Sequence, residues 1–180
     1  MNIIIRYVNG TPNYGLWYSK DSNACLAGYS DVDWAGSVDD RKSTSGGCFY
    51  LGNNLVSWMS KKQNSVSLST AEAEYIAVGS CCTQLLWMKK LFHDYGIPQD
   101  TMCVFCNNTS AISLSMNPIQ HSKSKHIEIR YHFIRALVED KVVCLEFIHT
   151  NKQKADIFTK PLDGPRFESL RKTIGVGTIP

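Results

Sequence analysis

Three short apolar segments, separated by a polar loop and by a tight turn, open the regularly patterned part of the chain. They lie at about 25–31, 46–51 and 55–60. The Gly-Asn-Asn sequence at 52–54, between the second and third segments, is typical of a hairpin turn. The pattern therefore predicts three consecutive antiparallel strands, a β-meander.

The strongest helix pattern of the chain follows the meander. Ser69 and Glu72 match a capping box, and Gly96 followed by Pro98 is a typical helix end, so one long helix is expected between them. Projection at about 100° per residue places Glu74 at the head of an apolar stripe and Glu72 on the opposite, solvent-facing side. The stripe continues through Val78, Cys81, Leu85, Met88 and Phe92. An inward-facing carboxylate is uncommon, which makes Glu74 a candidate functional residue.

Strand and helix patterns alternate in the second half of the chain. Strands are expected at 101–106 and 142–149, and helices at 108–116, after a basic segment at 121–126, and from Asn151 to Pro161. The last twenty residues are weakly patterned, and no role is assigned to them. A meander followed by this alternation predicts an α/β fold with a mixed five-stranded sheet flanked by helices. Polar groups at strand ends and helix starts would then meet at one edge of the sheet.

Composition limits the function classes. The 180 residues, 43% of them hydrophobic and 19% charged, suffice for one compact domain, and no apolar run approaches the ~18 residues of a membrane span. We expect that domain at 23–162, with the tail of an upstream element at 1–22 and a C-terminal tail at 163–180. A net charge of +3 permits nucleic-acid binding without requiring it. Seven cysteines without a regular framework, and no secretory signal, favour an intracellular setting.

Two acids at the end of the first strand are the first candidate site. Asp31 and Asp33 follow a segment of small and apolar residues, where a carboxylate is costly to bury unless a cation pairs with it. An Asx-type turn that ends the strand is the alternative interpretation. Both acids would face the same side of a strand, so alternation does not distinguish between them.

Several motifs resemble the ribonuclease H domain of copia-type retrotransposon polyproteins. They are GYSDVDWAG at 28–36, RKSTSG at 41–46, LSTAEAEYIA at 68–77, NTSAI at 108–112, KHIEIRYHF at 125–133 and ADIFTKPL at 155–162. Their order and number make the resemblance specific over about 24–162. The segment at 5–16 also resembles the connection that joins the reverse transcriptase to this domain, which makes 1–22 the end of that connection and the reverse transcriptase a partner within the parent polyprotein.

The resemblance implies a ribonuclease H-like fold and hydrolysis of the RNA strand of an RNA–DNA hybrid. Its site residues fall on Asp31, Glu74 and Asp156, which would bind two Mg²⁺ ions, with Mn²⁺ as a substitute. The family's remaining acid falls on Asn107, so the resemblance implies impaired activity here. His149 stands where such enzymes can place a mobile, proton-shuttling histidine.

Two alternatives remain at the sequence level. Cys103, Cys106, His121 and His126 satisfy a Cys₂His₂ zinc spacing, which would make the chain a zinc-binding nucleic-acid module. Strand residues three apart point to opposite faces, which argues against it. The second alternative is a catalytically dead retroelement remnant that keeps the fold and binds nucleic acid; both Asn107 and a start at Met1, inside the connection segment, agree with it.

Overall fold

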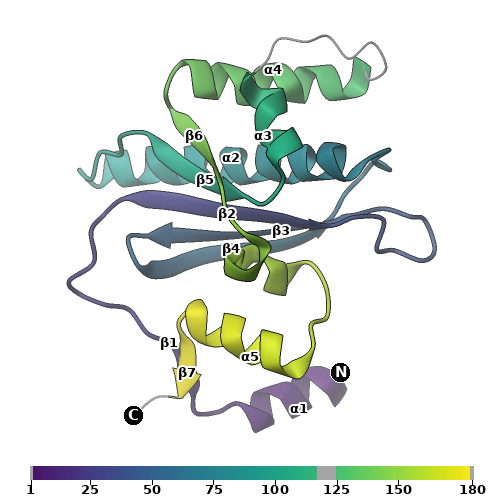
Figure 1. Cartoon of the computed structure of the whole chain (residues 1–180). Coiled ribbons are helices and arrows are strands. Elements are labelled where there is room, and N and C mark those ends of the chain that lie inside the picture. The colour runs from purple at the N-terminus through teal and green to yellow at the C-terminus, as the bar shows by residue number, and fades with distance from the viewer. Residues whose placement is uncertain (1, 117–124, 179–180) are drawn as a thin grey trace.

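The computed structural model describes the backbone of residues 2–116 and 125–178 and the side chains of 3–116 and 132–178. Its centre is a five-stranded sheet in the order β4-β3-β2-β5-β6 (Figure 1). The strands are β2 (Leu26–Asp33), β3 (Thr44–Leu51), β4 (Asn54–Lys62), β5 (Met102–Cys106) and β6 (Val143–Phe147). β2, β3 and β4 are antiparallel, whereas β5 and β6 run parallel to β2. The predicted mixed sheet is confirmed.

One long helix, α2 (Thr70–Asp94), packs on the sheet, and its ends are those that the sequence predicts. The Ser69 side chain accepts a hydrogen bond from Glu72 N at 3.1 Å, and Gly96 has a φ of +74°, the left-handed conformation of a helix stop. The Glu72 carboxylate accepts from Leu68 N at 2.8 Å, and Glu72 is exposed, as the predicted solvent-facing side requires. A Cβ at Gly28 would lie 2.7 Å from Cys81 Sγ, so glycine allows α2 to approach β2 closely.

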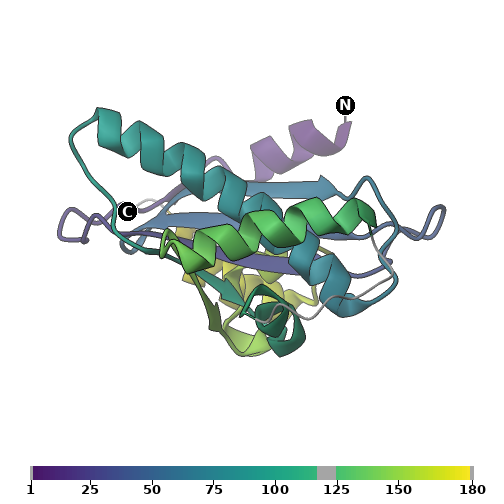
Figure 2. The ribbon, with the colours of Figure 1, turned by 90° about the horizontal axis from the view of Figure 1, so that it is seen from above.

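Two further helices complete the layer on this side of the sheet. α3 (Thr109–Met116) begins where Asn108 Oδ1 accepts from Ala111 N at 3.0 Å, and α4 (Lys125–Glu139) lies across α2 (Figure 2). The main core lies between this layer and the sheet. Its largest fully buried members include Tyr75, Leu85, Met102 and Ile134. The core therefore fixes α2 against β2 and β5.

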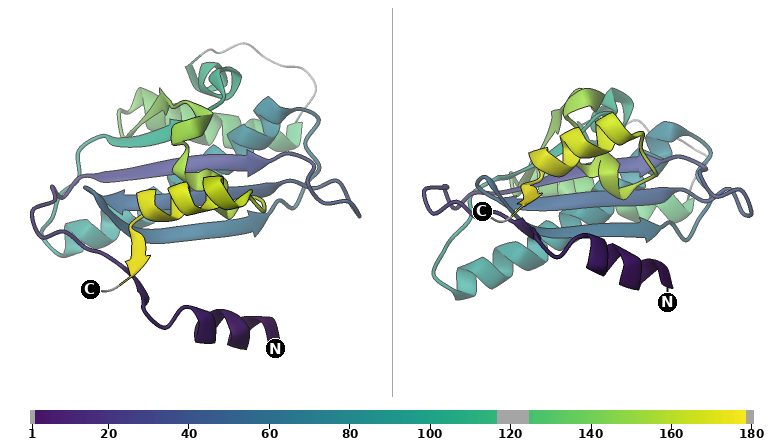
Figure 3. Two further views of the ribbon diagram at one scale, coloured as in Figure 1. Left: turned by 60° about the horizontal axis from the view of Figure 1, so that its bottom comes forward. Right: turned by 90° about the horizontal axis from the view of Figure 1, so that it is seen from below.

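The opposite face of the sheet is covered by the C-terminal part of the chain. It carries two 3₁₀ helices, η1 (Thr150–Lys152) and η2 (Lys154–Phe158), in place of the single helix predicted from Asn151. α5 (Gly164–Thr173) and β7 (Val176–Thr178) follow, although the sequence pattern predicts no element there. Asp163 caps α5 by accepting from Arg166 N at 3.0 Å. α5 lies on this side of the sheet, which is turned toward the viewer in Figure 3.

The N-terminal segment lies beside this C-terminal layer. β7 pairs antiparallel with β1 (Tyr14–Leu16), and α1 (Asn2–Gly10) extends away from the sheet (Figure 3). Apolar side chains of α1 are largely exposed, with Ile3 at 83% and Ile4 at 70%. No helix among residues 2–116 and 125–178 combines the length and the apolar character that crossing a membrane requires.

Candidate active site

Asp31 is the central residue of the candidate site. Ser30 in β2 pairs with Cys106 in the parallel strand β5, and this register brings Asp31 next to Asn107, which follows β5 directly. Asp31 is only 3% exposed. Its Oδ1 accepts from Asn107 Nδ2 at 3.1 Å, and its Oδ2 lies 3.2 Å from the Thr159 hydroxyl. The strand register alone therefore brings together two residues that are 76 positions apart.

Glu74 enters the site from the first turns of α2. It is 6% exposed, and its Oε2 has no hydrogen-bond partner among the described residues. Burial, followed by the charge of Asp31, raises the pKa of Glu74 to about 9. The direction follows from the cost of a charged carboxylate in a low-dielectric setting beside a second one. The predicted inward orientation of Glu74 is confirmed.

Asp156 reaches the site from η2 on the other face of the sheet. It is 5% exposed and forms ion pairs with Lys160 Nζ at 3.0 Å and with Arg166 at 3.3 Å. The buried Gln153 holds η2 in place, because its Nε2 donates to Ser30 O at 2.9 Å and its Oε1 accepts from Ala155 N at 3.2 Å. A Cβ at Gly46 would lie 2.8 Å from Ala155 O, so a side chain at Gly46 would push η2 off the sheet.

The three acids form one electrostatic unit around Asp31. Burial first, and then the charge of Asp156, raise the pKa of Asp31 to about 6, while Lys160 acts in the opposite direction. Asp31 thus interacts with both Glu74 and Asp156. The carboxylate oxygens of all three do not lie within 4.8 Å of one another, so they form an extended row rather than a single tight cluster.

The donor set fits hard divalent cations. Three buried carboxylates and an amide supply only oxygen ligands, which Mg²⁺ and Mn²⁺ prefer. Glu74 Oε2 and Asn107 Oδ1 are both buried and both lack a hydrogen-bond partner in the described part of the chain. Buried polar atoms are rarely left unpaired, so these two oxygens are natural ligand atoms. Asn107 contributes no charge, which leaves one negative charge fewer than four acids would provide.

His149 lies at the edge of this region, on the connection from β6 to η1. Its side chain is exposed, and its ring stands edge-on to Phe147 with centroids 5.3 Å apart. It lies seven residues before Asp156, as the sequence shows. Its catalytic role stays a prediction.

Three basic or polar residues at the site were missed by the sequence reasoning. Thr159 and Lys160 lie within the ADIFTKPL motif, three and four residues after Asp156, so helical spacing could have placed them beside it. Arg166 Nη1 and Nη2 also donate to the backbone oxygens of Asn151 and Thr150, both at 2.7 Å. The only signal for Arg166 was the Asp-Gly-Pro start of α5, a typical helix N-terminus.

The Cys₂His₂ hypothesis is wrong for its cysteine pair. Cys103 and Cys106 both lie within β5, where Cys106 is fully buried in the main core and Cys103 is half-buried on the opposite face. Two side chains on opposite faces of a sheet cannot bind the same ion. His121 lies outside the described residues, as does the side chain of His126.

Solved structures with a similar fold are ribonuclease H domains. The N-terminal RNase H domain of Rv2228c from Mycobacterium tuberculosis superposes with a TM-score of 0.56 at 9% identity, over 84% of this chain and 99% of that chain. LC11-RNase H1, solved in complex with an RNA/DNA hybrid, gives a TM-score of 0.54 at 15% identity, over 74% of this chain and 93% of that one. The chain therefore has the ribonuclease H fold.

Relatives in sequence are Pol polyproteins of plant retrotransposons. The chain is 41% identical over 98% of its length to the retrovirus-related Pol polyprotein from transposon RE1 of Arabidopsis thaliana, and 39% identical over 96% to that from transposon TNT 1-94 of Nicotiana tabacum. It spans only 12% and 13% of these relatives. A comparison with protein-family models found no match. The chain thus has the ribonuclease H fold and is similar, over nearly its whole length, to a short part of retrotransposon Pol polyproteins.

Proposed function

We propose that this chain is a divalent-metal-dependent ribonuclease H domain that hydrolyses the RNA strand of RNA–DNA hybrids, and that Asn107 strongly reduces its activity. The proposal is supported by three buried acids that converge on Asp31 and by the fold of the structural neighbours, one of which was solved with such a hybrid. In the parent polyprotein the reverse transcriptase would act beside it, in an intracellular setting, and produce the hybrid.

Each residue has a role in this proposal. Asp31, Glu74 and Asp156 would hold the cations, and Asp31 interacts electrostatically with both of the other acids. Two Mg²⁺ ions, or Mn²⁺ ions, held there would activate a water and stabilise the leaving oxygen. Gln153 and Arg166 position the η1–η2 segment and thereby Asp156. His149, exposed on the connection between β6 and η1, would carry a proton away from the site.

The hydrogen bond from Asn107 Nδ2 to Asp31 Oδ1 carries the proposal of reduced activity. At 3.1 Å, the amide occupies a carboxylate oxygen that Asp31 would offer to a cation. A carboxylate at 107 would instead repel Asp31 and favour a cation between them. Asn107 thus removes a charge and also gives Asp31 a neutral internal partner. Since losses even outside the immediate ligand shell of a metal cost ~10–100-fold, loss of a direct ligand should cost at least ~100-fold in activity.

Cleavage of a labelled RNA–DNA hybrid tests this directly. The natural chain, Asn107→Asp and Asn107→Asp with Asp31→Asn are compared at matched Mg²⁺ and again at matched Mn²⁺. We expect little or no cleavage by the natural chain, restored cleavage by Asn107→Asp, and loss again in the double variant. Equal rates for the natural chain and Asn107→Asp would show that the third ligand is not residue 107.

A catalytically inactive, hybrid-binding domain is the second candidate. It is favoured by the internal partners of Asp156, whose carboxylate already pairs with both Lys160 and Arg166. If Asn107→Asp folds and binds the hybrid but does not cleave it, the inactive domain is the better description.

A further inference from the structure

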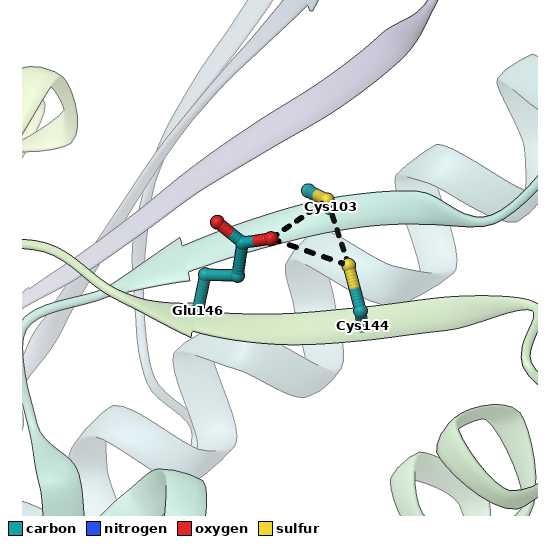
Figure 4. Close-up of side chains that lie close together, drawn as sticks. All are labelled: Cys103, Cys144 and Glu146. Carbon is teal, nitrogen blue, oxygen red and sulfur yellow. Dashed lines mark hydrogen bonds between the residues drawn. The ribbon is translucent and has the colours of Figure 1, made fainter.

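A second group of potential metal ligands lies on the sheet, away from the candidate active site. Cys103 of β5 and Cys144 of β6 are directly paired in the parallel ladder, and their Sγ atoms lie 2.7 Å apart (Figure 4). Glu146 is two residues after Cys144 and therefore on the same face. Its Oε1 points at both thiols, 3.4 Å from Cys103 Sγ and 3.9 Å from Cys144 Sγ.

This arrangement is set apart from the rest of the molecule by its compactness. Among the side chains of 3–116 and 132–178, it is the one group of three Cys, His, Asp or Glu side chains whose ligand atoms all lie within 4.8 Å of one another. The two thiols are half-buried and Glu146 is exposed, so an ion can enter from solvent and keep a water ligand. Glu146 takes part in none of the ion pairs formed by the described residues.

The donor types select a different metal from that of the candidate active site. Two thiols and one carboxylate suit a borderline or soft divalent cation such as Zn²⁺, whereas Mg²⁺ prefers oxygen alone. Tetrahedral Zn²⁺ with bonds of ~2.0–2.3 Å separates its ligands by roughly 3.5 Å, close to the two sulfur–oxygen distances observed. The sulfur atoms would have to move apart by about 1 Å, which also relieves their close contact.

A disulfide between the same cysteines is the competing state. The spacing of adjacent strands, about 4.7–4.9 Å, lies within the Cα separation of about 4.4–6.8 Å that disulfides allow. A disulfide would, however, give no role to the carboxylate of Glu146, whose Oε1 points at both thiols. The experiment below therefore has to distinguish the bound cation from the disulfide.

We propose that Cys103, Cys144 and Glu146 bind a thiophilic divalent cation of the Zn²⁺ class, with water as the fourth ligand. The ion links the edge strand β6 to β5. Cys103 lies four residues before Asn107, which corresponds to about 13 Å along an extended strand, so the two sites are separate.

Titration of the reduced, chelator-stripped protein with Cd²⁺ tests the site, followed through the ultraviolet thiolate-to-metal charge-transfer absorption. We expect saturation at one ion per chain, competition by Zn²⁺ and no competition by excess Mg²⁺. Cys103→Ser and Cys144→Ser should abolish the absorption at stoichiometric Cd²⁺, and Glu146→Gln should weaken binding at least about 10-fold. Two control variants, Cys25→Ser at an exposed cysteine and Asp31→Asn in the candidate active site, should leave the absorption unchanged.

Three results would overturn the proposal: no saturable absorption, an absorption that survives loss of both Cys103 and Cys144, or a Cys103–Cys144 disulfide that forms in air and persists in the presence of Zn²⁺.

If the serine variants do not fold, the rate of alkylation of each cysteine in the natural chain provides the test. Zn²⁺ must then slow modification of Cys103 and Cys144 but not of Cys25. Equal rates with and without Zn²⁺ would also exclude the site.

Discussion

At the scale of single residues, the three acids of the candidate site differ in how far other side chains stabilise their charge. Asp156 has Lys160 and Arg166, and Asp31 has hydrogen bonds from Asn107 and from the Thr159 hydroxyl. Glu74 is the exception, because its Oε2 is buried and has no hydrogen-bond partner among the described residues. A carboxylate in that position stabilises a bound cation and destabilises the cation-free fold.

Glu74→Gln should therefore stabilise the protein in the presence of a chelator. Burial raises the pKa of Glu74 to about 9 from its ordinary 4.5, so the folded state holds a proton that the unfolded state has lost between these pH values. The free energy of unfolding of the natural chain must then fall as pH rises through this window. We expect Glu74→Gln to gain at least about 1 kcal/mol at pH 8 and almost nothing at pH 4.5.

Chemical denaturation at the two pH values measures this gain. The exposed Glu168→Gln is the matched control and should show no pH-dependent gain. Lower stability of Glu74→Gln than of the natural chain at pH 8 would mean that Glu74 has a partner in solution.

At the scale of elements, features that depend on local sequence were predicted, whereas features that depend on contacts between distant residues were not. The limits and orientation of α2 follow from a capping box, a glycine stop and a stripe of side chains, all within one segment. The mixed character of the sheet was predicted from the alternation of strands and helices, and the position of Asn107 beside Asp31 from the family resemblance; the order of the strands was not predicted. η1 and η2 were predicted as one helix because their geometry depends on a side chain, Gln153, that bonds to Ser30 O 123 positions away. No local pattern encodes that contact.

The orientation of α2 can be tested through stability. Leu85 is fully buried in the main core, so Leu85→Ala should cost about 2–4 kcal/mol through lost burial and a cavity. Glu72→Ala removes only the hydrogen bond to Leu68 N and should cost within ~1 kcal/mol. Thermal and denaturant unfolding of both variants give the comparison. A larger loss for Glu72→Ala would contradict the packing of α2 described above.

Arg166 links α5 to the segment that carries Asp156. Its guanidinium donates to Thr150 O and Asn151 O at 2.7 Å and lies 3.3 Å from the Asp156 carboxylate. A hydrogen bond to a charged group contributes about 1.5–3 kcal/mol to stability. Arg166→Ala should lower the free energy of unfolding by about 1–3 kcal/mol and speed amide hydrogen exchange at 150–158. Lys172→Ala, an exposed residue of the same helix, is the control. Unchanged exchange at 150–158 in Arg166→Ala would show that α5 does not hold the segment.

At the scale of the whole molecule, the end of the sheet that carries the acids also carries basic residues. Val32 of β2 pairs with Ser45 of β3, and Ser45 pairs with Lys61 of β4. Two strand spacings of about 4.7–4.9 Å therefore place Lys61 roughly 10 Å across the sheet from the strand end that bears Asp31. Phosphates of a hybrid bound at the acids would lie within reach of it. The charge of the neighbouring Lys62 is less available to a phosphate, because Lys62 forms an ion pair with Asp40 at 2.9 Å.

Hybrid binding should therefore survive in the natural chain even where cleavage does not, and it should depend on Lys61 more than on Lys62. Binding through phosphates releases counterions, so we expect affinity to fall steeply as salt rises. Lys61→Ala should lower the slope of log K against log salt by about 1, while Lys62→Ala, whose charge Asp40 already neutralises, should lower it less. Fluorescence anisotropy with a labelled hybrid at several salt concentrations, with metal omitted, separates binding from cleavage. Affinity that is independent of salt, or a larger effect of Lys62→Ala, would place the hybrid on another surface of the molecule.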